Sequence, residues 1–469
     1  MLCFFLTGVT GLVYELVWVR ILILSFGSTQ FAITTVLTTF MSGLAIGSLI
    51  FGRLIDRYKK PLRMYGILVI FLGGYCIFTP LIFYVIKTLY LTSFSSTGIQ
   101  YASFNPNQFL FSFAGIILPA TLMGGTLPVL SKYFTLEKEH IGYNIGVLYS
   151  INTLGAVLGC TITGFFLLYL FGVKTTIYLA GVLDIIVGTV IVFLSLRGKT
   201  YDIPYTKDKT FEIPKWDKGK GKTKINLAIE KLPINKIVVA TFAISGFAAL
   251  AYEVLWTRVF SLIIGSSIYA FTIMLATFLF GIGIGSIIFA PFIDRRKAPL
   301  LWFAILELII GISAILSVPL YKELPFIFLK LHSIFSQNFW LFSFIQFLLC
   351  SAIMIIPTLC MGAIFPTVSR IYAKDLDKIG QSIGNIYFFN TIGAILGSFV
   401  GGFIMIPFIG VQLSIILTSA TSTFLGVLLL TLTSIKTFKK VAAAGVITIA
   451  FIVFVYNTPS WNRTIMTFG

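Results

Sequence analysis

The sequence predicts an all-α, polytopic membrane protein made of two parallel six-helix repeats and one further helix. Composition is the first observation behind this prediction: of 469 residues, 58% are hydrophobic and only 11% are charged, and the mean hydropathy is +1.00. Soluble domains carry about 25% charged residues, so this composition excludes a soluble enzyme, and it also excludes a disordered chain. The other two observations are thirteen long apolar runs and a constant offset between the two halves of the chain.

The apolar runs are long enough to cross a bilayer, whose core takes about 20 residues of helix. The first run is too long for a cleavable signal sequence and is expected to remain as a span. The runs lie near 1–26, 30–52, 64–86, 108–131, 143–170, 175–196, 236–264, 269–292, 299–321, 339–368, 379–408, 411–434 and 440–457.

The first six runs and the next six are copies of each other at a constant offset of 238 residues. GLVYELVWVR at 11–20 aligns with ALAYEVLWTR at 249–258, and NTLGAVLG at 152–159 aligns with NTIGAILG at 390–397. The offset also holds through the loops, which chance similarity between apolar runs would not produce. Because six is even, both copies enter the membrane from the same side, and the repeats are parallel about an axis along the membrane normal.

The segment between the repeats is rich in Lys, Asp, Pro and Gly and has no apolar period, which predicts a flexible linker. Its positive charge also suits contact with anionic lipid headgroups. The expected parts of the chain are a first membrane repeat (1–197), a basic linker (198–235), a second membrane repeat (236–434), a thirteenth helix (435–457) and a C-terminal segment (458–469).

The basic residues predict the orientation in the cell membrane. Twenty-seven Lys and Arg lie in loops on one side, eleven of them between Arg197 and Lys236, whereas five lie on the other side. Lys and Arg concentrate in cytoplasmic loops, so the N-terminus and the linker are expected in the cytoplasm. Thirteen spans then place the C-terminus outside, unless residues 440–457 do not cross fully.

No metal, other cofactor or nucleic-acid partner is expected. The five cysteines lie in apolar runs without CxxC spacing, as small core residues do. The two histidines, His140 and His332, lie far apart in the chain. The net charge of +18 belongs to the loops, so it indicates membrane orientation rather than a nucleic-acid surface.

Charged residues inside the predicted spans are the candidate substrate-binding residues. A charge at the bilayer centre costs about 2.5–3.5 kcal/mol, so each needs a partner or a wet cavity. Glu15 and Arg20 are five residues apart and do not face one another on a helix. We expect them to pair across the repeats, either as a cation or proton site or as an ion-pair cluster that fixes how the halves dock. The candidates are Glu15, Arg20, Glu253, Arg258, Asp184 and Glu307.

Asp184 and Glu307 have no acidic counterpart in the other repeat, because they align with Ser422 and Val69. Such asymmetric acids are candidates for contact with a specific ligand. The alternative is that each lies near the membrane surface and reaches toward water.

The box YExxWxR adds polar aromatic residues to this region. Tyr14 and Trp18, with their copies Tyr252 and Trp256, either belong to a binding site or anchor the helices at the membrane interface. Small residues spaced as GxxxG recur in both repeats and predict close helix packing, with lining of a substrate path as the alternative.

Two family resemblances rest on these motifs. GRLIDRYKKP at 52–61 resembles the loop between helices two and three of the major facilitator superfamily. The resemblance implies that Gly52, Asp56 and Arg57 latch cytoplasmic helix ends and govern alternating access. The second copy, APFIDRRKAP at 290–299, keeps the Asp-Arg pair but replaces the Gly and Arg before it, so a latch there is less expected.

The second resemblance covers nearly the whole chain. The YExxWxR box, the FGS at 26–28, the GLAIGS helix and the NTxGAxxG helix together resemble the membrane half of bacterial fused major-facilitator-like/spermidine synthase proteins. NTPSWNRTIMTFG at 457–469 resembles the lead-in to the synthase domain of those proteins. That domain is not in the sequence, so no catalytic residue of the transferase can be assigned here.

The resemblance implies a polyamine connection and leaves three functions open. The first is transport or channelling of a small cationic, polyamine-like metabolite. The second is a catalytically silent membrane anchor for an aminopropyltransferase domain as C-terminal partner. The third is aminopropyltransferase activity itself, as an activity of the full-length fused product.

The charge asymmetry leads to a test of topology. A single cysteine at Lys218, in a background without other cysteines, is expected to react with an impermeant thiol reagent only after the cells are permeabilised. Labelling of intact cells would overturn the orientation.

Overall fold

The computed structural model confirms the all-helical fold. It describes residues 1–26, 29–58, 60–94, 106–135, 141–197, 234–265, 267–296, 298–373, 378–433 and 437–461, and every regular element among them is a helix. Among the described residues, thirteen helices are long and apolar enough to cross a membrane, in the predicted order. The predicted linker lies almost wholly outside the described residues, as do 462–469 at the end of the predicted C-terminal segment.

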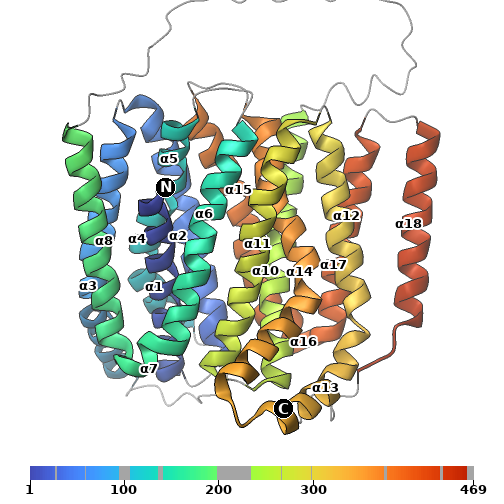
Figure 1. Cartoon of the computed structure of the whole chain (residues 1–469), viewed down its shortest axis with the longest axis horizontal. Helices are drawn as coiled ribbons and strands as arrows, with labels where there is room; N and C mark the ends of the chain where they lie inside the picture. Colours follow the sequence, from blue (N-terminus) through green and yellow to red (C-terminus); the bar gives the residue numbers. More distant parts are fainter. Residues whose placement is uncertain are drawn as a thin grey trace, which may run out of the picture.

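The first half of the bundle holds six spans, two of them made of more than one helical segment (Figure 1). Its helices are α1 (Leu2–Phe26), α2 (Thr29–Arg57), α3 (Pro61–Phe94), α4 (Pro106–Gly124), α5 (Thr126–Phe134), α6 (Ile141–Ile162), α7 (Leu168–Leu170) and α8 (Gly172–Arg197).

The second half holds the other seven spans and a helix that the apolar runs did not predict. Its helices are α10 (Ile234–Ile263), α11 (Ile268–Asp294), α12 (Pro299–Ser317), α13 (Leu320–Phe335), α14 (Phe339–Tyr372), α15 (Ile379–Phe399), α16 (Ile406–Ile409), α17 (Val411–Thr431) and α18 (Thr437–Asn457).

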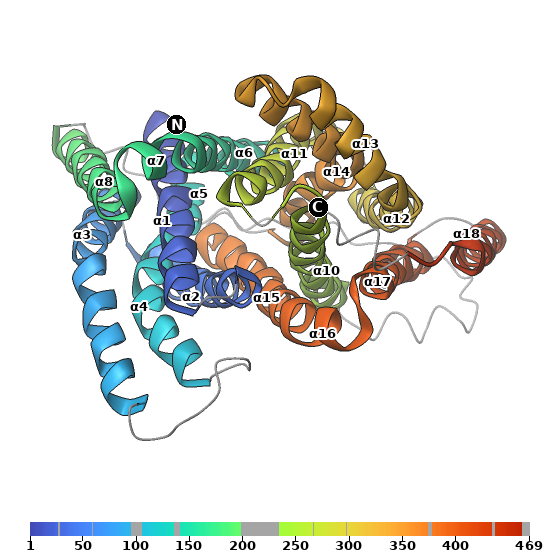
Figure 2. The same cartoon turned by 90° about the horizontal axis from the view of Figure 1, so that it is seen from below.

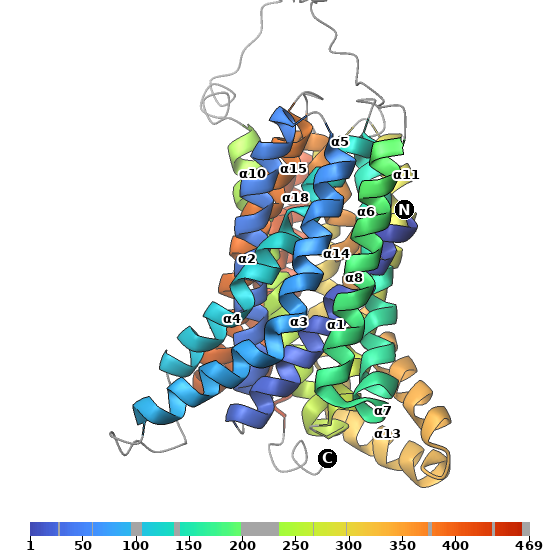
Figure 3. The ribbon, with the colours of Figure 1, turned by 90° about the vertical axis from the view of Figure 1, so that its left-hand side faces the viewer.

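The unpredicted helix is α13, which lies below the spans and inclined to them (Figures 1 and 3). Its charged residues Lys322, Glu323 and Lys330 are exposed, whereas Tyr321 and Leu324 are buried. These charges shorten its apolar stretch, so a search for membrane-spanning apolar runs assigns the segment to a loop. At the edge of the bundle, α18 packs on α17 (Figure 2), and none of its apolar span is buried.

Local sequence signals explain several helix ends. Pro61 and Pro299, one in each repeat, begin α3 and α12, where proline lacks only an N–H that the helix would not use. Ser267 caps α11 by accepting a hydrogen bond from the Ala270 N–H at 3.1 Å.

The two halves lie side by side and meet along two equivalent helix pairs (Figure 2). α2 packs along α15, and α11 packs along α6. Glycines permit this approach: a Cβ on Gly52 would lie 2.8 Å from the Gly380 carbonyl oxygen, and one on Gly146 would lie 2.5 Å from Ala290 Cβ of α11. Several GxxxG residues thus pack against helices, as predicted from their spacing.

We call the end of the bundle that carries Arg57, Asp294 and Arg197 the basic face, and the other end the opposite face. At the basic face each half caps a helix of the other half. Asp56 accepts hydrogen bonds from the Gly380 and Gln381 N–H groups of α15 at 3.1 and 2.7 Å, and it pairs with Lys132 at 3.5 Å.

The second copy of the latch motif makes the same kind of contact, although its sequence departs from the pattern. Asp294 accepts a hydrogen bond from the Tyr143 N–H of α6 at 2.7 Å and pairs with Arg370 at 3.7 Å. A carboxylate at a helix N-terminus accepts free N–H groups and complements the helix dipole. The latch therefore depends on the aspartate, which both copies retain.

The α2–α15 and α6–α11 interfaces are also closely packed near the opposite face. The span that begins with α6 contains a π-helical turn at Thr163–Leu167, and the span that begins with α15 contains one at Val400–Met405. A Cβ on Gly164 would overlap Thr272 of α11, and one on Gly402 would overlap Thr34 of α2. The halves are thus in contact on both sides of the bundle centre.

The latch leads to a test of stability. Asp56→Ala and Asp294→Ala each leave helix N–H groups without their acceptor, at a cost of about 1–3 kcal/mol. We expect each to lower the apparent melting temperature of the detergent-purified protein. The two losses should add, because the two sites lie on different helix pairs and the partners described for one differ from those described for the other. Arg53→Ala, which removes an exposed side chain of the same helix, is the control. Melting temperatures equal to that of the control would contradict the latch.

Candidate functional site

The centre of the bundle contains two buried glutamates, one from each half. Glu15 of α1 and Glu253 of α10 occupy equivalent positions in the repeats, and each residue is only 4% exposed. Their carboxyl groups lie within electrostatic range of each other. The Cys160 thiol of α6 lies within range of both, which places the two glutamates together at the interface between the halves.

The predicted pairing of these glutamates with arginines is wrong. Arg20 is exposed and Arg258 is partly buried, and no ion pair joins either glutamate to either arginine in the described part of the chain. An arginine five residues on points to a different side of its helix. The repeat therefore sets acid against acid across the interface, and the ion-pair cluster is not formed.

Sequence reasoning missed two tyrosines here, one beside Glu253 and one beside that first tyrosine. Tyr149 of α6 is within electrostatic range of Glu253 and of Tyr387 of α15. The Phe365 ring packs on both, with ring centroids 4.9 Å from Tyr149 and 6.0 Å from Tyr387. A signal was present in the sequence, because each tyrosine stands three residues before the repeated Asn-Thr. We call Glu15, Glu253, Tyr149 and Tyr387 the central acidic site.

Asp184 is not part of the central acidic site. It is fully buried within the first half and accepts hydrogen bonds from Thr10 Oγ1 at 2.8 Å and from the Tyr14 hydroxyl at 2.7 Å. Tyr14 and Glu15 are neighbours on α1 and point about 100° apart. α1 therefore stands between Asp184 and the interface, and the alternative that Asp184 reaches toward water is wrong.

Glu307 is likewise buried, within the second half, at 1% exposure. Its electrostatic neighbours include Tyr252 of α10 and Cys360 of α14. One carboxyl oxygen, Oε1, has no hydrogen-bond donor among the described residues. Glu307 therefore does not reach the surface either, and it lies on the Tyr252 side of α10.

The aromatic residues of the box are core residues and not interfacial anchors. Tyr14 stacks on Trp18 with ring centroids 5.9 Å apart, and Tyr252 stacks on Trp256 at 5.0 Å. All four side chains are fully buried. The same side chains also contact neighbouring helices of their own half: α8 and α2 for α1, and α17 and α11 for α10. These contacts set the rotation of α1 and α10, and that rotation turns the residue after each tyrosine, the glutamate, toward the other half.

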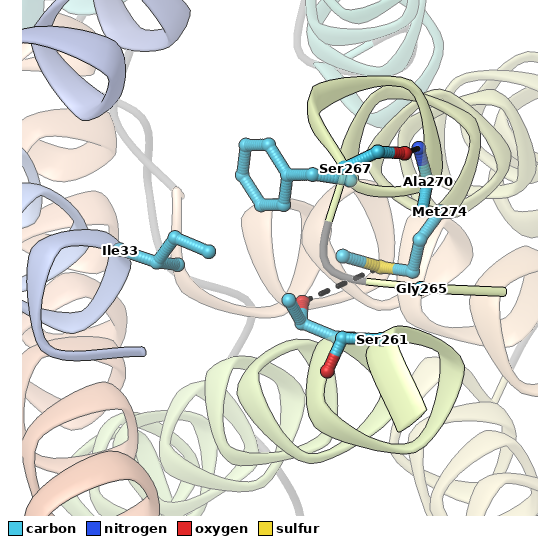
Figure 4. Close-up of a pocket in the computed structure, with 8 residues that line it drawn as sticks. Ile33, Ser261, Gly265, Ser267, Ala270 and Met274 are labelled. Atoms are coloured by element: carbon cyan, nitrogen blue, oxygen red, sulfur yellow. Dashed lines mark hydrogen bonds between the residues drawn. The ribbon is translucent and has the colours of Figure 1, made fainter. Parts of the chain in front are cut away.

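A small pocket lies one helical turn from Glu253, toward the opposite face (Figure 4). Its volume of about 20 Å³ is enough for about one water molecule. The single hydroxyl hydrogen of Thr257 has two acceptors in reach, the Glu253 carbonyl oxygen at 2.7 Å and Met274 Sδ at 3.6 Å from Oγ1. The pocket is lined by Ile33 from the first half and by Thr257, Ser261, Gly265, Ser267, Ala270, Phe271 and Met274 from the second.

A metal centre would need several His, Cys, Asp or Glu side chains close together. Within the described ranges, no group of three or more such side chains is arranged to hold a metal ion. The described side chains of the central acidic site are two carboxyl groups beside aromatic rings.

Comparisons with known proteins agree with this architecture. The family model described as Major Facilitator Superfamily matches residues 1–335. No curated protein matches the chain.

Two solved structures share the fold. The crystal structure of a single-residue variant of the E. coli fucose:proton symporter FucP is 16% identical, with a TM-score of 0.52, and the match covers 91% of this chain and 97% of that one. A bacterial homologue of the iron transporter ferroportin, in an outward-facing state, is 14% identical, with a TM-score of 0.53 and coverage of 91% and 96%. At these identities the likeness concerns the fold alone.

The Asp184 contacts lead to a matched pair of substitutions. Tyr14→Phe removes a 2.7 Å donor from a buried carboxylate, at a cost of about 1–3 kcal/mol. Its counterpart Tyr252→Phe removes only a 3.2 Å contact with the Ser419 hydroxyl. We expect Tyr14→Phe to lower the apparent melting temperature more than Tyr252→Phe. An equal or smaller loss would show that Tyr14 does not stabilise Asp184.

Proposed function

Because this chain belongs to the Major Facilitator Superfamily, and is thus a multi-pass membrane protein for transport of a small solute, we propose that its solute is a small organic cation of the polyamine type. We propose that the central acidic site binds this cation. The supporting observation is the pair of buried carboxyl groups, Glu15 and Glu253, for which the described residues provide no basic partner.

The physical argument is charge compensation. An ionised carboxyl group inside the membrane needs a counter-charge or a hydrogen-bond donor. Two ionised carboxyl groups near each other also repel, so the pair needs a counter-charge more than a single group does. A solute with ammonium groups supplies both charge and donors. The rings of Tyr149, Phe365 and Tyr387 add faces on which a cation or its alkyl chain can pack.

We propose that the basic face is cytoplasmic, because it carries most of the basic loop residues. The end of the described chain supports thirteen crossings. Trp461 donates from its indole N–H to the Val318 carbonyl oxygen at 3.1 Å and stacks edge-on against Tyr321, with ring centroids 5.4 Å apart. Both partners belong to the opposite face, so α18 returns the chain there.

In this proposal the solute reaches the site by alternating access. The Asp56 and Asp294 contacts hold the basic face closed, and the glycine–threonine contacts close the opposite face. Opening one set while the other stays closed would expose the central acidic site to each side in turn. The pocket beside Thr257 lies on the path from the opposite face.

A second candidate is a membrane anchor for an aminopropyltransferase domain, as the resemblance to fused spermidine synthases implies. The same resemblance supports a polyamine as the solute. However, Trp461, in the segment that resembles a synthase lead-in, contacts Val318 and Tyr321 at the opposite face. A domain following it would lie on the side away from the linker, where a nucleotide-derived donor is scarce, so we rank transport first.

Counterflow in proteoliposomes tests the proposal. With unlabelled putrescine inside, we expect entry of external radiolabelled putrescine above that into empty liposomes. Glu15→Gln and Glu253→Gln should each lower the rate at least tenfold, because each removes half of the counter-charge. Glu323→Gln, a substitution of an exposed acid on α13, is the matched control. Wild-type counterflow equal to that of empty liposomes, or no effect of either central substitution, would refute the proposal.

A further inference from the structure

A buried polar cluster lies inside the second half, among α10, α12 and α17 (Figure 2), away from the central acidic site. Its members are Glu307, Ser245, Ser422 and Thr423, and each residue is at most 6% exposed. We infer that Glu307, Ser422 and Thr423 bind a sodium ion, which holds the helices of this half together. This inference goes beyond the proposed function and does not depend on the solute.

The contact between α10 and α12 places the carboxyl group of the cluster. Phe242 of α10 and Phe303 of α12 pack edge to face, with ring centroids 6.4 Å apart. Ser245 and Glu307 stand one turn further along these two helices, on the same sides as the two rings. The Ser245 hydroxyl accordingly lies beside the Glu307 carboxyl group, so the acid points into the space that α10 and α12 share.

The contact between α12 and α17 places the hydroxyl groups. Gly311 stands one turn after Glu307 on the same side of α12. A Cβ on Gly311 would overlap Thr423 Oγ1 of α17. The Thr423 hydroxyl therefore points at α12, at the level of the turn that joins Glu307 to Gly311.

The repeat places Ser422 beside the same glycine. Asp184 is the counterpart of Ser422 in the first half, and Gly73 is the counterpart of Gly311. A Cβ on Gly73 would lie 2.9 Å from Asp184 Cβ. Since the two halves share one fold, Ser422 lies against Gly311 in the same way, one turn from Glu307.

Three oxygen atoms of this cluster have no hydrogen-bond partner among the described residues: Glu307 Oε1, Ser422 Oγ and Thr423 Oγ1. Most hydroxyl groups on α17 instead donate to a carbonyl oxygen one turn earlier, as Thr418 and Ser419 both do at 2.8 Å. Buried polar atoms without a partner are rare and call for a bound water or ion. Three of them, from two adjoining helices, therefore indicate a shared ligand.

The first half shows how an acid at this place is satisfied without an ion. There Asp184 accepts hydrogen bonds from Thr10 at 2.8 Å and from Tyr14 at 2.7 Å. In the second half Ala248 replaces the threonine, and Tyr252, the counterpart of Tyr14, contacts a serine hydroxyl of α17 at 3.2 Å. The donors that satisfy the first acid are thus missing or engaged elsewhere in the second half.

The chemistry of these atoms indicates a small monovalent cation. Carboxylate and hydroxyl oxygens are hard ligands, which do not favour soft metals. The cluster holds one acid, and no described basic side chain pairs with it. One positive charge therefore balances Glu307, whereas a divalent ion would leave a net charge inside the membrane. The expectation of no metal rested on cysteine and histidine spacing, which hydroxyl ligands do not follow.

The close approach of α12 and α17 favours sodium over the larger potassium ion. A Cβ on Gly426 of α17 would lie only 2.6 Å from Leu308 Cγ of α12, next to Glu307. The helices are thus in contact on either side of the cluster, at Gly311 and at Gly426. A larger ion between them would have to push them apart.

Binding of radioactive sodium to the detergent-purified protein tests the inference directly. We expect one ion per chain, displaced by unlabelled sodium but not by equal potassium or by putrescine. Glu307→Gln should abolish the binding, whereas Glu323→Gln, the exposed matched control, should retain it. Glu15→Gln should retain it too, because the central acidic site is a different site. No binding by the wild type, or loss in Glu15→Gln with retention in Glu307→Gln, would overturn the inference.

A stability measurement decides the matter if Glu307→Gln does not fold. We expect the apparent melting temperature of the wild type to be higher in sodium than in equal potassium, by about 2 °C or more. Ser422→Ala should keep the value in potassium and lose at least half of the increase in sodium, because it removes a ligand of the ion. Removal of a hydroxyl that is simply unpaired would leave the increase unchanged. That result, or no increase in the wild type, would contradict the sodium site.

Discussion

A carboxyl group inside a bilayer must find a donor, a cation or a proton, and this requirement explains the arrangement of the acids in this protein. Asp184 has two hydroxyl donors within its own half. Asp56 and Asp294 have the N-termini of helices in the other half. Glu15 and Glu253 have neither within the described chain, and they lie between the halves, where we propose that the solute binds.

The internal repeat makes these contacts come in pairs. One offset relates Asp56 to Asp294 and Glu15 to Glu253, so a contact that one half makes on its partner is returned by the partner. The same symmetry sets identical groups against each other at the centre. For hydrogen-bonding pairs this doubles the stabilisation, whereas for two acids it creates a deficit of positive charge. The asymmetric acids, Asp184 and Glu307, lie off the interface, where symmetry imposes no partner.

Much of the fold was predictable from the sequence. The number and order of the spans follow from apolar length, and the parallel repeats follow from the constant offset, because both are properties of the chain itself. α13 was missed because its charged residues interrupt the apolar run, and only uninterrupted apolar runs were used to predict helices. The second latch was doubted because the motif departs at two positions, but the contact needs only the aspartate.

The site was less predictable, because tertiary packing decides which side chains face each other across the interface between the halves. The spacing of Glu15 and Arg20 correctly excludes a contact between them, but it does not say which residue of the other half each one meets. The contacts of Tyr14 with Asp184 of α8 and of Trp18 with Phe40 of α2 decide this, because they set the rotation of α1. Tyr149 and Tyr387 were missed for a similar reason: their repeat is visible in the sequence, but the approach of Tyr149 to Glu253 and of Tyr387 to Tyr149 depends on how α6 and α15 pack.

A structure of the protein in a lipid nanodisc with putrescine present tests the central claim most directly. The account predicts putrescine between the two halves, with its ammonium groups within hydrogen-bond distance of the Glu15 and Glu253 carboxyl groups. Putrescine bound elsewhere, or a direct ion pair of Glu15 with Arg258, would contradict it.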